Sequence, residues 1–251
     1  MSAFTVSLLV FCCVFGVGYL ATLLREHLPE QHLTAETKDT VKLTMGLVGS
    51  MTALILGLLV ASAKGTYDTQ RGDVIALSAK FVLMDRIFAH YGPESASARE
   101  RLHHTVESMI DRLWPDSKSQ PAKLDPTESA GDSLYNEIEA LTPKGESQVR
   151  LKNEAINSAM DVAGVRWLFY EQSGSAISAP LLAVVIGWLA VLSASFGLFA
   201  PANGTARAAL LICALSVSGA IFLILELDQP FSGLIQVSKQ PMEMALAHLG
   251  K

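Results

Sequence analysis

The chain has 251 residues, of which 50% are hydrophobic and 17% charged, and its mean hydropathy is +0.35. So many charges exclude a bundle embedded wholly in lipid, and so much apolar sequence indicates a membrane protein that carries a polar domain. The net charge is −5, and acidic and basic residues are interspersed, which argues against nucleic acid as a partner.

Four windows are long and apolar enough to cross the ~30 Å hydrocarbon core of a bilayer. They cover about 3–24, 43–63, 180–199 and 208–225. No basic region precedes the first window, and its apolar run is about twice the usual length in a signal peptide, so we expect a retained helix. Four spans place both termini on one side of the membrane, together with the long segment between the second and third spans.

The second window continues into an amphipathic segment with no proline before Pro93. Beyond Lys64, charged residues are mixed with large apolar residues spaced three and four apart, which are Val74, Leu77, Phe81, Met84 and Phe88. We therefore predict one helix over 41–91. A helix of roughly 75 Å is not stable alone in water, so its apolar stripe must pack on other helices of the same or neighbouring chains.

The polar segment is also helical in pattern. Helices are predicted over 94–114, 132–141 and 146–172, with a surface loop at 116–131 and a brief amphipathic piece near the C-terminus. The expected buried stripe of the helix over 146–172 is Val149, Ile156, Met160, Ala163, Trp167 and Tyr170.

The predicted fold class is an all-α membrane protein, with four transmembrane helices and a cytoplasmic helical domain, in which the second span continues as a long helix. We divide the chain into the first two spans (1–63), the helical domain (64–178), the last two spans (179–227) and a tail (228–251). Lys and Arg near the membrane ends are more frequent on the side of the helical domain, which places that domain and both termini in the cytoplasm.

No catalytic arrangement can be assembled from the sequence. It contains no phosphate-binding loop or nucleophile elbow, and the four windows contain no carboxylate or histidine. His103 and Glu107 lie one helical turn apart, as in metal sites, but no further ligand follows at metal spacing, so we expect a solvated helix face. We expect no enzyme activity, no metal and no cofactor.

The second span has two contrasting faces at 100° per residue. Small residues form one stripe, which is Gly46, Gly49, Ser50, Ala53, Gly57 and Ala61. The residues roughly opposite are Thr44, Val48, Met51, Ile55, Leu59 and Ser62. Small stripes commonly serve ordinary helix packing. If this one packs on the first and fourth spans, the opposite face can line a symmetric pore that gates by dewetting.

Two carboxylates, Glu226 and Asp228, follow the last span at the predicted cytoplasmic mouth. They suit either of two roles. One is a structural clasp that bonds the turn at Pro230 or pairs with a base, and the other is a ring of charge near the pore. The Pro-Phe-x-Gly sequence that follows is turn chemistry, and Phe231 is suited to pack back into a core.

The pattern resembles a family, the bacterial bestrophin-like membrane proteins. The resemblance covers most of the chain and rests on four stretches: Gly57–Val60, Tyr67–Arg71, the helix over 153–167 and, most specifically, Leu225–Ile235. It implies a four-span homo-oligomer, tetrameric or pentameric, in the bacterial inner membrane, distantly similar to bestrophin anion channels. The acidic calcium-binding clasp of true bestrophins is not evident, so calcium gating is not carried over.

Two hypotheses follow for function. The first is a homo-oligomeric ion channel, anion-selective if the resemblance extends that far, with the second span around the axis. Its partners would be the lipid bilayer, small ions and further copies of itself. The alternative is a non-conducting membrane scaffold or sensor that acts through its cytoplasmic helices. A ring with a continuous axial cavity would favour the first hypothesis.

Overall fold

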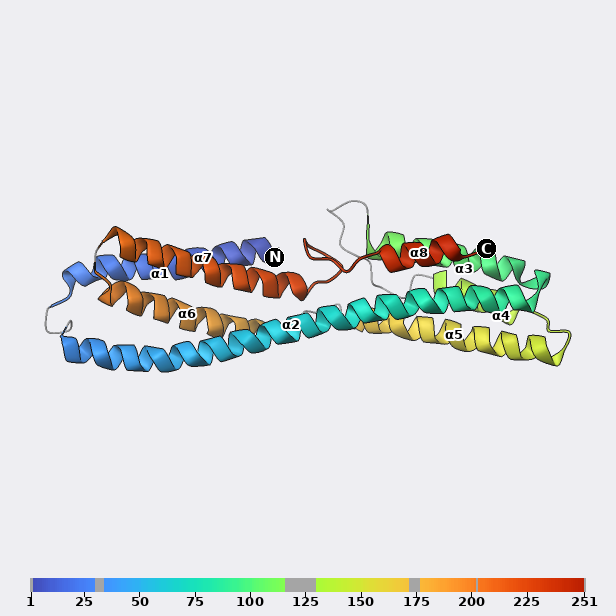
Figure 1. The fold of residues 1–251 in the computed structure, drawn as a ribbon, viewed down its shortest axis with the longest axis horizontal. Helices are drawn as coiled ribbons and strands as arrows, with labels where there is room; N and C mark the ends of the chain where they lie inside the picture. The colour runs from blue at the N-terminus through green and yellow to red at the C-terminus, as the bar shows by residue number, and fades with distance from the viewer. Residues whose placement is uncertain (1, 30–33, 116–129, 172–176, 202, 251) are drawn as a thin grey trace. The chain divides into compact units, whose positions relative to one another are not determined.

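The protein is described by a computed structural model, which covers residues 2–29, 34–115, 130–171, 177–201 and 203–250. Within these ranges every regular element is helical, and Figure 1 shows the ribbon. The chain divides into two compact units. Unit 1 comprises Met1–Thr66 and Ala176–Asp228, and unit 2 comprises Tyr67–Ser175 and Gln229–Lys251. The predicted all-helical class with four long apolar helices is confirmed.

Unit 1 contains the four helices that are long and apolar enough to cross a membrane. They are α1 (Ala3–Leu24), the first part of α2 (Ala35–Tyr91), α6 (Ala179–Phe199) and α7 (Gly204–Leu227). Helix α2 begins earlier than predicted, where the Thr34 hydroxyl accepts a hydrogen bond from the Thr37 backbone N–H at 3.3 Å. Helix α7 begins at a second cap, in which Asn203 Oδ1 accepts from the Ala206 N–H at 2.8 Å.

Helix α1 packs on α6 and α7, as Figure 1 shows. The contact with α6 depends on glycine, because a Cβ added at Gly197 would lie 2.1 Å from the carbonyl oxygen of Gly18. Beside it, Ser193 Oγ donates to the Val14 carbonyl at 2.8 Å. Small residues and a buried hydroxyl therefore bring these two backbones together, as is common between helices in lipid.

Unit 2 has its own apolar core. It is formed by the second part of α2, α3 (Ala96–Leu113), α4 (Ala130–Glu139), α5 (Glu146–Glu171) and α8 (Gln240–His248). A short 3₁₀ helix, η3 (Pro93–Ser95), joins α2 to α3. The predicted stripe of α2 is confirmed as core, since the side chains from Val74 to Phe88 in that stripe are at most 1% exposed. Their packing partners belong to the same chain.

The predicted stripe of α5 is wrong except at Ile156, which is half-buried and packs against the core of unit 2. Val149, Met160, Trp167 and Tyr170 are 44%, 60%, 49% and 43% exposed, whereas the buried side chains of α5 are Ala155, Val162 and Phe169. The period of the pattern is helical, but Met160, Trp167 and Tyr170 lie on the outer face. The predicted loop over 116–131 lies almost entirely outside the described residues.

Candidate functional site

The membrane part of α2 is the least buried of the four apolar helices. Only 11% of its apolar window is buried, against 22–28% in the other three. Leu43, Leu47, Leu54 and Leu58 are each at least 65% exposed. A long, continuous face of α2 therefore has no packing partner within the described chain.

The six predicted pore-lining residues fall into two groups. Thr44, Met51 and Ser62 are exposed, whereas Leu59 is 4% exposed and belongs to an apolar cluster of unit 1. Ile55 is partly buried and packs against the same cluster, and Val48 is of intermediate exposure. One chain does not test which face lines a pore between copies, so the set remains a prediction.

The pore interpretation assumes that the small residues of α2 pack on the first and fourth spans, but five of the six lie on the open side. Gly46, Ser50, Ala53, Gly57 and Ala61 are all exposed, and a Cβ at Gly46 or Gly57 would meet no atom within 4 Å. The cluster of unit 1 instead receives the larger side chains Leu59 and Ile55, together with Ala63. A pattern of small and large residues does not show which of two faces meets the same chain.

Several hydroxyl groups along this helix are satisfied by its own backbone. Thr44 Oγ1 donates to the Thr40 carbonyl at 3.0 Å, and Ser50 Oγ donates to the Gly46 carbonyl at 2.9 Å. A hydroxyl that donates in this way keeps acceptor lone pairs and lies in a dry helix at little cost. The open face of α2 is thus mostly apolar, with hydroxyls placed at intervals.

A groove runs between α2 and α6 in unit 1. Its volume is about 640 Å³, and its lining includes Met45, Gly46 and Gly49 of α2 and Leu192 and Phe196 of α6, with Lys42 among the lining residues. The lining is largely apolar, as expected for a surface that meets hydrocarbon or another helix.

The two carboxylates at the predicted mouth are both buried. Glu226 and Asp228 are each 6% exposed at the end of α7, and both take part in interactions within the structure. The turn that follows is ordered by backbone bonds, since Ser232 N–H donates to the Gln229 carbonyl at 3.0 Å and Val237 N–H to the Pro230 carbonyl at 2.8 Å.

Phe231 packs into the core of unit 2, as predicted. It is 6% exposed and meets the rings of Trp114 and Phe169 edge to face, with centroids 5.7 and 5.3 Å away. Trp114 Nε1 donates to the Val237 carbonyl at 2.8 Å, which fixes the segment after Pro230 against α3 and α5.

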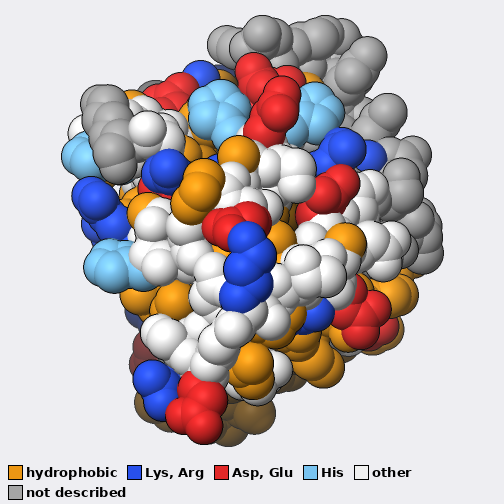
Figure 2. Space-filling view, turned by 90° about the vertical axis from the view of Figure 1, so that its right-hand side faces the viewer, with side chains coloured by type: hydrophobic (Ala, Val, Ile, Leu, Met, Phe, Trp, Pro, Cys, Tyr) orange, Lys and Arg blue, Asp and Glu red, His pale blue; other side chains and the backbone are white. Residues whose placement is uncertain are grey.

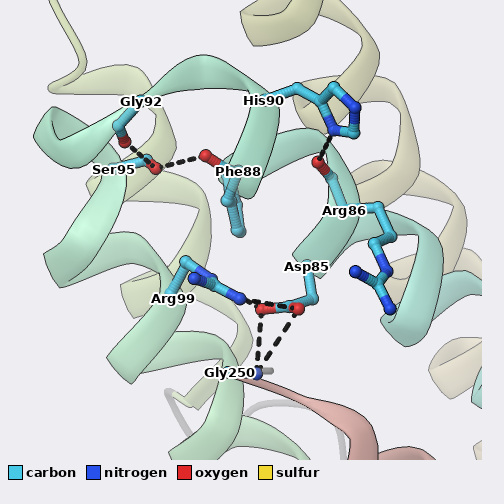
Figure 3. A network of polar contacts seen from close by, with 8 residues as sticks. All are labelled: Asp85, Arg86, Phe88, His90, Gly92, Ser95, Arg99 and Gly250. Carbon is cyan, nitrogen blue, oxygen red and sulfur yellow. Dashed lines mark hydrogen bonds and ion pairs between the residues drawn. The ribbon is translucent and has the colours of Figure 1, made fainter.

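Sequence inspection missed a buried ion pair in unit 2. The Arg99 guanidinium makes two hydrogen bonds to the Asp85 carboxylate, at 2.7 and 2.9 Å, and Asp85 is 2% exposed (Figure 3). The Gly250 N–H approaches both carboxylate oxygens at 3.4 Å. The bond to Asp85 raises the pKa of Arg99, so the guanidinium stays charged. The sequence feature that could have indicated this ion pair is Asp85 itself, a carboxylate that directly follows Met84 of the apolar stripe of α2.

The histidines of α3 lie on the surface, as expected. His103 and His104 are exposed and line an open cleft of about 540 Å³ with Glu100, Glu107 and Arg99. Figure 2 shows histidine and acidic side chains gathered at this end of unit 2. His104 Nδ1 lies 3.8 Å from Glu107 Oε2. Within the described ranges, no three His, Cys, Asp or Glu side chains are placed to share a metal ion.

Comparison with known families decides what this arrangement of helices is. The model of the bestrophin-like domain matches residues 12–242, which is most of the chain. The chain belongs to the bestrophin-like family. No curated protein matches it.

Two solved structures share the bestrophin-like fold of this chain. One is described only as a membrane protein carrying a point mutation, with a TM-score of 0.69 at 12% identity, covering 97% of both chains. The other is a point mutant of a bacterial bestrophin homologue from Klebsiella pneumoniae, with a TM-score of 0.67 at 14% identity, covering 96% of this chain and 94% of that one. At such identities the similarity shows the fold alone.

Proposed function

We propose that this bestrophin-like protein is one subunit of a homo-oligomeric ion channel in which α2 surrounds the axis. The observation that carries the proposal is the open face of α2, where glycine, alanine and hydroxyl residues lie beside exposed leucines. A helix that meets only lipid has no need of small residues or hydroxyls, whereas close neighbours use the former and a water-filled path uses the latter.

Within this proposal, the pore is lined by the members of the predicted set that the single chain leaves accessible. Met51 would form a narrow apolar section between Thr44 and Ser62, which contribute hydroxyls nearer the two ends. Such a section can gate by dewetting. Val48 and Ile55 flank it, and Leu59 supports it from the cluster of unit 1.

Anion selectivity is supported by the absence of acidic residues from the apolar window of α2. Lys42 precedes the window, Lys64 follows it, and both are exposed. Between them the helix has no charged residue. A path with no carboxylate along it carries no negative charge that would exclude anions.

We place the protein in the bacterial inner membrane as a multi-pass protein, with unit 2 and both termini in the cytoplasm. The support is the excess of Lys and Arg on that side and the bestrophin homologue of bacterial origin that shares the fold. A non-conducting scaffold is the alternative outcome of the experiment that follows.

The test is flux of chloride and of potassium from proteoliposomes containing the purified full chain. We expect chloride flux above that of empty vesicles, and a higher basal flux for Met51→Ser, because a wetted constriction conducts. Val191→Ser is the matched control, since Val191 is 51% exposed on α6, away from the proposed path. An oligomer that passes neither ion would exclude the channel and favour the scaffold.

A further inference from the structure

Helix α5 has a second apolar face that its own chain leaves uncovered. Ala155, Val162 and Phe169, spaced seven apart, form the buried side. Met160 and Trp167 share a different side and are 60% and 49% exposed. Unit 2 carries the charged residues expected of a water-exposed domain, and large aromatic and thioether side chains at this exposure favour a partner there.

Helix α2 presents a second uncovered strip within the same unit. Ile75 and Leu83 are 48% and 51% exposed, and the residues between them on that face, Ala76 and Ala79, are small. The opposite side of this part of α2 forms the core, with Leu77, Phe81 and Met84 fully buried. Unit 2 thus offers two apolar strips, on two different helices.

The α5 strip points away from the line along which α2 and α5 meet. These helices run antiparallel, because Gln148 Nε2 donates to the Tyr91 carbonyl at 2.8 Å and Lys80 Nζ lies 2.5 Å from Asp161 Oδ2. At 100° per residue, Asp161 lies about 120° around α5 from Trp167. The α5 strip therefore cannot cover the α2 strip of its own chain.

We propose that the α5 strip of one copy packs on the α2 strip of the next copy. The interface is head to tail, because two different surfaces meet, and repetition of one such contact closes a ring when the rotation allows it. This interface rests on the proposed homo-oligomer, and it identifies the cytoplasmic surface through which the copies of that oligomer associate.

The register inside one chain predicts which residues meet across the interface. The facing pairs of α2 and α5 have residue numbers that add to about 240. If the symmetry axis of the ring is parallel to α2, corresponding residues of all copies lie at the same position along that axis. Residues that face each other across the interface then also have numbers that add to about 240. It places Trp167 between Gly72 and Ala76, and Ile75 beside Gly164.

Shape and charge support this register. Each large side chain meets a small one, and a Cβ added at Gly72 or Gly164 would find no atom within 4 Å, so both positions are open to a neighbour. The register also brings Arg71 near Glu171, both exposed residues, which gives the contact an ion pair at its rim.

The experiment is disulfide trapping in the full chain with its native cysteines, Cys12, Cys13 and Cys213, replaced by serine. Ala79→Cys and Ala163→Cys are introduced together, because both alanines are exposed and the register places them across the interface. Mild oxidation is expected to give a ladder of covalent multimers that ends at the ring size. The control pair, Ala79→Cys with Ala140→Cys on exposed positions, is expected to remain monomeric on a denaturing gel.

A second variant measures the strength of the contact. Trp167→Glu is expected to weaken association about thirtyfold, as an interface anchor does, while leaving the helix content unchanged because Trp167 is half exposed in one copy. A ladder that stops at the dimer, or an unchanged oligomer in Trp167→Glu, would overturn the interface. Chloride flux without a ladder would support the channel and reject this interface. A ladder without chloride flux would support this interface and reject the channel.

Discussion

Loss of Arg99 should destabilise unit 2 more than loss of any exposed basic residue. The Asp85 carboxylate is 2% exposed, and two charge-assisted bonds at 2.7 and 2.9 Å tie it to Arg99. The variant Arg99→Met keeps the approximate length of the side chain and removes the charge. Among the described residues, the buried carboxylate then keeps only the distant N–H of Gly250 as a partner. Breaking a buried pair from one side typically costs ~3–5 kcal/mol.

The lower end of that range applies here, because the side chain of Arg99 is 27% exposed and water reaches the pair. We therefore expect a loss of about 3 kcal/mol, which lowers the melting temperature by roughly 6–12 °C for a protein of this size. Thermal unfolding in detergent, followed by tryptophan fluorescence, measures it. The exposed Arg150→Met on α5 is the control and should stay within about 0.5 kcal/mol of the parent.

A double variant separates the ion pair from simple loss of packing. Asp85→Leu combined with Arg99→Met replaces both charges with apolar groups, which is often neutral or stabilising. It should recover most of the loss of the single variant. A cost below about 1 kcal/mol for Arg99→Met, or no recovery in the double variant, would refute the view that the buried carboxylate depends on this guanidinium.

Three further predictions concern other parts of the chain. Gly197→Ala should lower the thermal stability of the membrane unit, because its Cβ would lie 2.1 Å from a carbonyl of α1, whereas Gly187→Ala on α6 should not, because a Cβ there meets no atom within 4 Å. The hydrogen bond from Lys144 lowers the pKa of Glu94, so this pair adds stability above the ordinary Glu pKa. The stability gap between the parent and Lys144→Gln in denaturant titrations should therefore close as the pH falls through and below that ordinary value, ~4.3. Asp228→Asn should lower the melting temperature with no change in reversal potential if this buried carboxylate is a clasp, and should shift the reversal potential if it belongs to a charge ring.

Much of the fold can be predicted from the sequence because its signals are local. Apolar windows of sufficient length identify four membrane helices, and a stripe at 3.6-residue spacing identifies the buried side of α2 between Val74 and Phe88. Phe231 could be assigned to a core because the Pro-Phe-x-Gly turn sends the chain back on itself. Each of these inferences needs only neighbouring residues.

The choice between two apolar faces is not local. Met160, Trp167 and Tyr170 outnumber Phe169, the one large residue on the buried side, so side-chain size favours the wrong side of α5 as the core. A helix that packs between its own chain and a neighbouring chain needs two apolar sides, and the bulkier side can be the one that packs against the neighbour. The ion pair of Asp85 was missed for the same reason, since its partner lies on a separate helix.

The order in which the chain is made has a consequence for how unit 1 forms. Helix α1 packs on α6, yet about 150 residues separate them in the chain. At a synthesis rate of roughly 5–20 residues per second, α1 waits for about 8–30 seconds before its partner exists. During this interval the backbone around Gly18 faces lipid or the insertion machinery. Since most of unit 2, Tyr67–Ser175, is encoded between the two halves of unit 1, helices α3, α4 and α5 emerge during that wait. A deletion that shortens this segment would also shorten the wait.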